Sequence, residues 1–182
     1  MKQISFNIPF RSFKEVDYIA DAIKRNHFVG NGYYTKKCQF FIQKLLKIQK
    51  VLLTDSCTSA LEMSALLIRK NQTKQEVIMP SYTYPSTASA FLKAGFKIIF
   101  ADISSKNFMI DIDDVRKKIT KNTAAIVVVH YGSHCADIVK FKKLCKKKSL
   151  LLIEDAAQSF NSFIGNKSIG SYGDLSCLSF HE

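Results

Sequence analysis

Residues 150–155 read LLLIED, four consecutive apolar residues followed by two carboxylates. A second run, IVVV at residues 126–129, is also apolar throughout and leads directly to His130. Strands with one solvated face alternate apolar and polar residues, whereas strands covered on both faces read as continuous apolar runs. Both segments are therefore predicted to be central strands of a mainly parallel sheet.

The rest of the chain repeats this pattern of apolar runs with helical stretches between them. Strands are predicted at 51–54, 77–79, 97–101, 125–129, 150–153 and 175–179. Helices are predicted at 13–25, 35–48, 58–70, 85–94, 113–119 and 137–148, and a short hairpin at 163–169. Alternating strands and helices of this length are typical of an α/β protein with three layers, helices covering both faces of the sheet.

Composition indicates a folded globular protein. The chain has 182 residues, of which 47% are hydrophobic and 23% charged, so one sizeable core can form. No apolar run approaches the roughly 18 residues of a membrane-spanning helix, and the N-terminal segment lacks the pattern of a signal peptide. We expect a cytoplasmic protein with no membrane partner. The five scattered cysteines contain no Cys-x-x-Cys pair, so we expect reduced thiols.

The net charge of +12 raises the question of an anionic partner. Five lysines between positions 142 and 148 are its densest source. Only four residues are arginine, and no aromatic side chains are interleaved with the lysines as a stacking platform for bases would require. A solvated helix face is the favoured interpretation, and we expect no nucleic-acid partner.

Polar and aromatic residues follow the predicted strands. The segments concerned are 54–59, 80–84, 130–132, 154–155 and 179–181. Ligands of open α/β sheets bind beyond the carboxyl ends of the strands, so these segments are expected to meet at one edge.

Three features of that edge have two interpretations each. Hydroxyls at 56–59 could hold a phosphate at a helix N-terminus, or could simply cap the helix, and the segment alone favours neither. Asp155 could pair with a ligand cation, although a capping or salt-bridged role is the commoner one, and its burial requires a cationic or donor partner. Tyr84 could stack on a planar ring, although packing is commoner.

Several other chemistries are disfavoured by spacing. His130 and His134 lack the glutamate of a His-Glu-x-x-His metal site, and we expect no metal. Asn166 interrupts the Gly-Lys pair that a phosphate loop needs. The chain contains neither a Gly-x-Gly-x-x-Gly fingerprint after a strand nor a Gly-x-Ser-x-Gly elbow.

Taken in order, five segments resemble the DegT/DnrJ/EryC1/StrS family of sugar aminotransferases. They are LLTDSCT at 52–58, VIMPSYT at 77–83, VHY at 129–131, EDAAQ at 154–158 and LSFHE at 178–182. The resemblance implies the large domain of fold type I enzymes dependent on pyridoxal 5'-phosphate (PLP), with residues 1–182 forming its N-terminal part.

The resemblance also implies roles for individual residues. Thr58, Ser59 and Ser179 would hold the cofactor phosphate. Tyr84 would stack on the ring. Asp155 would pair with the pyridinium nitrogen, which keeps the ring able to accept electrons, and Gln158 would lie near the phenolic oxygen.

The family transfers an amino group, usually from glutamate, to a nucleotide-linked 4-keto-6-deoxy sugar, and its members are homodimers. Its covalent lysine follows the serine matching Ser179 by five residues, beyond Glu182, so we expect these 182 residues to be inactive alone and to lack the C-terminal small domain. Two alternatives stay open. One is a related dehydratase that uses pyridoxamine phosphate (PMP), and the other is a non-catalytic binding module.

Overall fold

The computed structural model describes residues 8, 10–28, 30–70 and 73–181. The chain divides into a smaller unit, Met1–Leu53 with Phe180–Glu182, and a larger unit, Thr54–Ser179. The smaller unit contains α1 (Glu15–Lys24) and α2 (Tyr33–Leu46). These helices are linked by a 2.7 Å hydrogen bond from the Tyr34 hydroxyl to Asp21.

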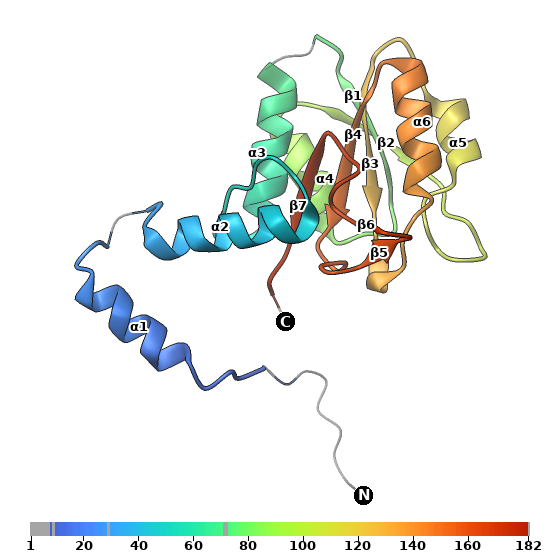
Figure 1. Cartoon of the computed structure of the whole chain (residues 1–182). Coiled ribbons are helices and arrows are strands. Elements are labelled where there is room, and N and C mark those ends of the chain that lie inside the picture. Colours follow the sequence, from blue (N-terminus) through green and yellow to red (C-terminus); the bar gives the residue numbers. More distant parts are fainter. Residues whose placement is uncertain (1–7, 9, 29, 71–72, 182) are drawn as a thin grey trace, which may run out of the picture. The chain divides into compact units, whose positions relative to one another are not determined.

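The larger unit is built on a five-stranded sheet of order β2-β1-β3-β4-β7, in which all neighbours are parallel (Figure 1). Its strands are β1 (Glu76–Pro80), β2 (Lys97–Ala101), β3 (Thr123–Val129), β4 (Leu151–Ala156) and β7 (Leu175–Leu178). Its helices are α3 (Cys57–Lys70), α4 (Pro85–Lys93), α5 (Ile112–Lys118) and α6 (Ile138–Lys148), with a 3-10 turn at Tyr131–Ser133. The fold is therefore an α/β fold with a parallel sheet, as predicted.

Two apolar clusters lie on the two faces of this sheet. Successive residues of a strand point to opposite faces. Ile126 packs in the cluster that contains Phe141 of α6, and its neighbour Val127 packs in the cluster that contains Leu61 and Phe91 of α3 and α4. Helices α5 and α6 thus cover one face and α3 and α4 the other (Figure 1).

Most predicted elements are confirmed, with boundaries shifted by a few residues. The hairpin at 163–169 consists of β5 (Phe163–Ile164) and β6 (Lys167–Ser168), which pair antiparallel around Gly165 at φ 59°. Glycine adopts such a positive φ without steric cost, which explains the tight turn. The five cysteines are free. No helix in the described ranges has the length and hydropathy to span a membrane.

The strand predicted at 51–54 is wrong. These residues pair with no strand among those described. Apolar, β-branched composition favours an extended backbone, but a strand also needs a neighbour for its ladder of hydrogen bonds. A second difference concerns β4, which continues to Ala156, so that Glu154 and Asp155 lie inside the strand and not after it.

Two leucines of α3, one buried and one exposed, allow the packing of the core to be tested. Leu61 is 1% exposed and Leu66 is 61% exposed. We expect Leu61→Ala to lower the free energy of unfolding by about 2–5 kcal/mol, because it leaves a cavity. Leu66→Ala, the same substitution on the same helix, should change it by less than about 0.5 kcal/mol. Urea denaturation measures both, and similar losses would contradict the assigned helix orientation.

Candidate functional site

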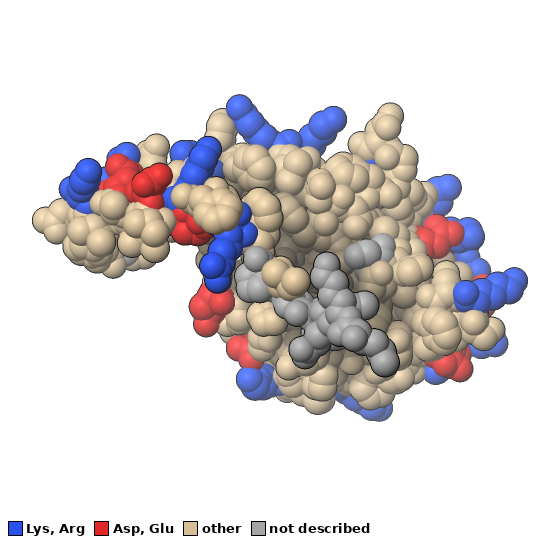
Figure 2. Space-filling model, turned by 90° about the horizontal axis from the view of Figure 1, so that it is seen from below, with Lys and Arg blue, Asp and Glu red and all other residues tan. Residues whose placement is uncertain are grey.

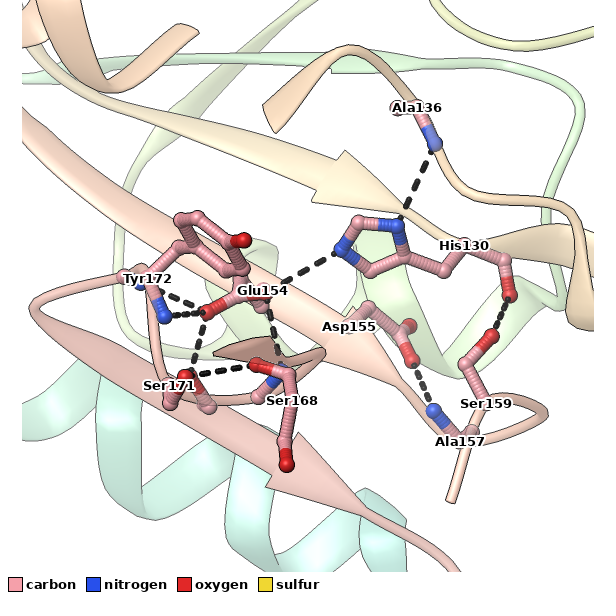
Figure 3. Close-up of polar contacts among 12 residues, drawn as sticks. His130, Ala136, Glu154, Asp155, Ala157, Ser159, Ser168, Ser171 and Tyr172 are labelled. Atoms are coloured by element: carbon pink, nitrogen blue, oxygen red, sulfur yellow. Dashed lines mark hydrogen bonds and ion pairs between the residues drawn. The ribbon is translucent and has the colours of Figure 1, made fainter. Parts of the chain in front are cut away.

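Strand β4 carries two adjacent carboxylates, both removed from water. Glu154 is 0% and Asp155 4% exposed. Because side chains alternate along a strand, Asp155 faces α3 and α4 with Ile153, and Glu154 faces the α5 and α6 side with Leu152. The two neighbouring acids therefore belong to two different environments (Figure 3).

Asp155 is held by two hydrogen-bond donors. The hydroxyl of Thr87 in α4 donates to Oδ2 at 2.6 Å, and the backbone N–H of Ala157 donates to Oδ1 at 3.2 Å. Desolvation nevertheless raises the pKa of Asp155, although these hydrogen bonds act in the opposite direction. The donor partner that burial required is thus present, and a cationic group placed beside this carboxylate would be strongly favoured.

Thr87 is the residue that sequence reasoning missed here. It is fully buried, and its hydroxyl also lies 2.8 Å from that of Thr83. A detectable signal was its place in the first turn of the helix that follows a central strand, at the edge where ligands bind.

The start of α3 lies on the same side of the sheet. Ser56 Oγ accepts the N–H of Ser59 at 3.1 Å, so Ser56 caps the helix, and a phosphate site at the same helix start stays a prediction. The N–H groups of Cys57 and Thr58 belong to the first turn, where helix geometry provides no acceptor. Burial raises the pKa of the Cys57 thiol to about 12, and the charge of Asp155 contributes. Asp155 and the helix start are therefore within electrostatic range.

The remaining predicted residues follow the same ends of other strands. Tyr84 is the N-cap residue of α4 and is 71% exposed. Gln158 Oε1 accepts the N–H of Gly132 at 2.6 Å, which ties the segments after β3 and β4 together. Ser179 directly follows β7 and is partly buried. Their roles toward a cofactor stay predictions.

Figure 2 looks onto the edge at which the strands end. In this view the charged side chains of the larger unit lie mainly at its periphery. Besides the buried Asp155, the exposed Asp55, directly before Ser56 at the start of α3, is a second carboxylate near the predicted residues.

Glu154 accepts five hydrogen bonds (Figure 3). Its donors are the N–H groups of Gly170, Tyr172 and Gly173 at 3.0, 2.7 and 2.6 Å, the Ser176 hydroxyl at 3.1 Å and the His130 ring at 3.2 Å. Although desolvation raises the pKa of Glu154, the hydrogen bonds from His130, Gly173 and Gly170 outweigh it and lower the pKa overall. Glu154 is thus an ionised structural anion.

His130, directly after β3, contacts both the side chain of Glu154 and the backbone of β4. Its Nδ1 accepts the N–H of Ala136 at 3.3 Å, so the proton resides on Nε2, which donates to Glu154. Its backbone N–H donates to the Asp155 carbonyl at 3.0 Å, and its carbonyl accepts the Ser159 hydroxyl at 3.0 Å. Among the described residues no group of three His, Cys, Asp or Glu side chains could hold a metal.

The loop around Glu154 depends on a glycine. A Cβ on Gly173 would lie 2.6 Å from the Leu175 carbonyl oxygen and 2.9 Å from that of Leu152. Any other residue would displace the backbone that donates to Glu154. Sequence reasoning missed this network, and its available signal was the pair Gly170 and Gly173 shortly before a strand.

The geometry defines a class of protein. An α/β fold with a buried carboxylate at the carboxyl edge, beside hydroxyls and first-turn N–H groups of a helix start, suits a ligand with a cationic nitrogen and an anionic group. The family model that matches residues 12–182 is that of the DegT/DnrJ/EryC1/StrS aminotransferase family, and the chain belongs to this family. Its members are aminotransferases that depend on PLP.

Individual relatives are sugar aminotransferases. A GDP-perosamine synthase of Vibrio cholerae is 32% identical over 169 residues, which are 91% of this chain and 45% of that protein. A 3-oxo-glucose-6-phosphate:glutamate aminotransferase of Bacillus subtilis is 33% identical over 83% of this chain and 33% of its own length. The solved structure of Helicobacter pylori PseC, an aminotransferase of pseudoaminic acid biosynthesis, has a TM-score of 0.88 and 26% identity, over 99% of this chain and 48% of that chain. The chain spans about half the length of these relatives or less.

The opposite environments of the two acids predict opposite effects on stability. The pKa of Glu154 is lowered from 4.5, so its stabilisation is present above pH 4.5 and is lost as the pH falls through the lowered value. The pKa of Asp155 is raised from 3.8, so its favourable contribution exists only at low pH and is lost as the pH rises. At pH 8 we expect Glu154→Gln to lower the free energy of unfolding by about 3 kcal/mol, and Asp155→Asn not to lower it.

Urea denaturation at pH 8 compares these variants. The partly exposed acid Glu62, which pairs with Lys93 at 2.6 Å, provides the matched control. Glu62→Gln should cost less than about 1 kcal/mol. Equal losses from the substitutions at 154 and 155 would contradict the separate environments.

Proposed function

We propose that this chain is the PLP-binding part of a sugar aminotransferase. In the whole protein, glutamate supplies the amino group and a nucleotide-linked 4-keto-6-deoxy sugar receives it, for cell-surface polysaccharide or lipopolysaccharide synthesis in the cytoplasm. The observation that carries this proposal is the buried Asp155, held by Thr87 and Ala157 with its pKa raised by desolvation.

The donor and acceptor groups fit PLP. A pyridinium nitrogen beside Asp155 would provide the positive charge that offsets the desolvation of this carboxylate. When bound, PLP supplies an electron-accepting ring and a carbon that carries the amino group. Asp155 would hold a proton on the ring nitrogen, while the hydroxyl of Thr87 orients the Asp155 carboxylate.

The phosphate site is proposed at the start of α3. Thr58 contributes its first-turn N–H and its hydroxyl, Ser59 contributes its hydroxyl, and Ser179 adds a third from the end of β7. Ser56 already caps the N–H of Ser59, so we assign the main backbone donor to Thr58. The helix dipole favours an anion at this position.

Two further residues complete the proposed cofactor site. Tyr84 lies at the N-terminus of α4, one helical turn before Thr87, with an exposed ring that a planar group can cover. Gln158 is positioned by the N–H of Gly132 and would act near the phenolic oxygen.

The substrate is proposed from the relatives. One is named for a GDP-linked product and another for glutamate as donor. We propose a nucleotide sugar and glutamate for this protein, with dTDP-4-amino-4,6-dideoxygalactose as the candidate product. A homodimer is part of the proposal, supported by the exposed Met63 of α3 and Leu92 of α4, which a second copy could cover.

Asp155→Asn tests the cofactor site without using turnover. The 182-residue chain is titrated with PMP, and binding is measured by calorimetry and by the absorbance of the ring. The variant should bind PMP at least tenfold more weakly, a loss of about 1.4 kcal/mol in binding free energy. It should also lose the absorbance spectrum of the protonated ring. The exposed Asp17, substituted in the same way, should leave both unchanged. Unchanged binding and spectrum in Asp155→Asn would contradict the pairing.

The covalent lysine is tested separately. We propose that none of the lysines within residues 1–182 fills this role, because the resemblance assigns it to a position after Glu182. Borohydride treatment of the chain with PLP, followed by peptide mapping, should yield scattered, substoichiometric labels on exposed lysines. One stoichiometric adduct at a single lysine, together with amino transfer from glutamate, would contradict this assignment.

A further inference from the structure

A basic groove lies between helices α5 and α6, on the face of the sheet opposite to Asp155. It has a volume of about 450 Å³ and is lined by Arg116, Lys140, Lys143, Leu144, Lys147 and Lys148. The lining side chains thus include five cations and no acid. Nothing in the proposed transamination uses this groove.

Helix α6 is the main source of the charge. It contains six lysines and no acidic residue, so this one helix contributes +6 to a chain whose net charge is +12. Its apolar side is used in the core, where Ile138, Phe141 and Leu144 are buried. The lysines therefore form the outward face of a helix that is already fixed in place.

Helix stability does not account for all of these lysines. Cations in the last turn interact favourably with the helix dipole, which explains Lys146, Lys147 and Lys148. Lys143 is the central residue of α6, outside the last turn where the dipole favours a cation, and it is four residues from Lys147, at a spacing where like charges repel. Such a cost suggests a function for the cluster.

Only part of the charge is neutralised within the chain. Arg116 pairs with Asp113 and Lys140 pairs with Asp137. Among the described residues Lys143, Lys147 and Lys148 are in no ion pair. Three ammonium groups are therefore available to one bound anion.

We propose that the α5–α6 groove binds an anion with several phosphate groups. Lysine ammonium groups are compact charges on flexible stems that can converge on phosphate oxygens. The lining contains no aromatic ring on which a base could stack, which disfavours a nucleic acid. The phosphates can belong to a soluble polyphosphate or to lipid headgroups, and both sources are tested below.

Titration of the full chain with inorganic tripolyphosphate tests the groove. The triple variant Lys143→Gln, Lys147→Gln, Lys148→Gln should bind at least tenfold more weakly, because glutamine retains helix propensity but removes the charge. The matched control substitutes Lys97, Lys106 and Lys121 by glutamine; these lysines are exposed and lie outside the lining. The control should change the affinity by less than twofold, and circular dichroism verifies folding of both variants.

A second arm distinguishes the source of the phosphate. If the chain sediments with phosphatidylglycerol vesicles but not with phosphatidylcholine vesicles, and only the groove variant loses this binding, the phosphates belong to lipid headgroups. Groove-dependent binding of tripolyphosphate without vesicle binding identifies a soluble anion. Three results would overturn the proposal. They are equal losses of affinity in the groove and control variants, binding of neither probe, and groove-dependent binding of a DNA duplex ten times more tightly than tripolyphosphate. The outcome is independent of PMP binding at Asp155.

Discussion

The pleat of β4 is the constraint on which the rest of the larger unit depends. It sends Glu154 and Asp155 to opposite faces of the sheet although they are adjacent in the chain. Burial of a carboxylate is costly unless donors replace the lost water. Glu154 has five such donors, whereas Asp155 has two. The incomplete compensation of Asp155 is what makes it suitable for a ligand.

The structural acid also positions the functional edge. Glu154 binds the loop 170–173, and the next residue, Asp174, accepts the N–H of Leu152 at 2.8 Å. These contacts fix where β7 begins to pair with β4, a pairing that extends over only four residues. Ser179 follows this short strand directly. Its position at the edge is therefore determined by a carboxylate on the opposite face of the sheet.

The sequence predicted the elements that local rules control. Continuous apolar runs identified β3 and β4. The helix predicted at 137–148 is α6, and its predicted start differs from the observed start by one residue. The strand at 51–54 was wrong because pairing depends on a partner distant in the chain, which local composition does not report. Burial predicted that Asp155 needs a donor. Thr87 was not identified as that donor because it lies 68 residues away in the chain.

The raised pKa of Asp155 couples the stability of the fold to its ligand. In the ligand-free chain, ionised Asp155 opposes folding at neutral pH, because the cost of its lost water exceeds the gain from the Thr87 hydroxyl and the Ala157 N–H group. A bound cation reverses this contribution, and any ligand that binds only the folded state adds stability in proportion to its concentration over its Kd. Glu154, by contrast, is satisfied within the chain and stabilises the fold with or without a ligand. One strand thus combines a carboxylate that is satisfied within the chain with a carboxylate whose desolvation the proposed ligand would offset.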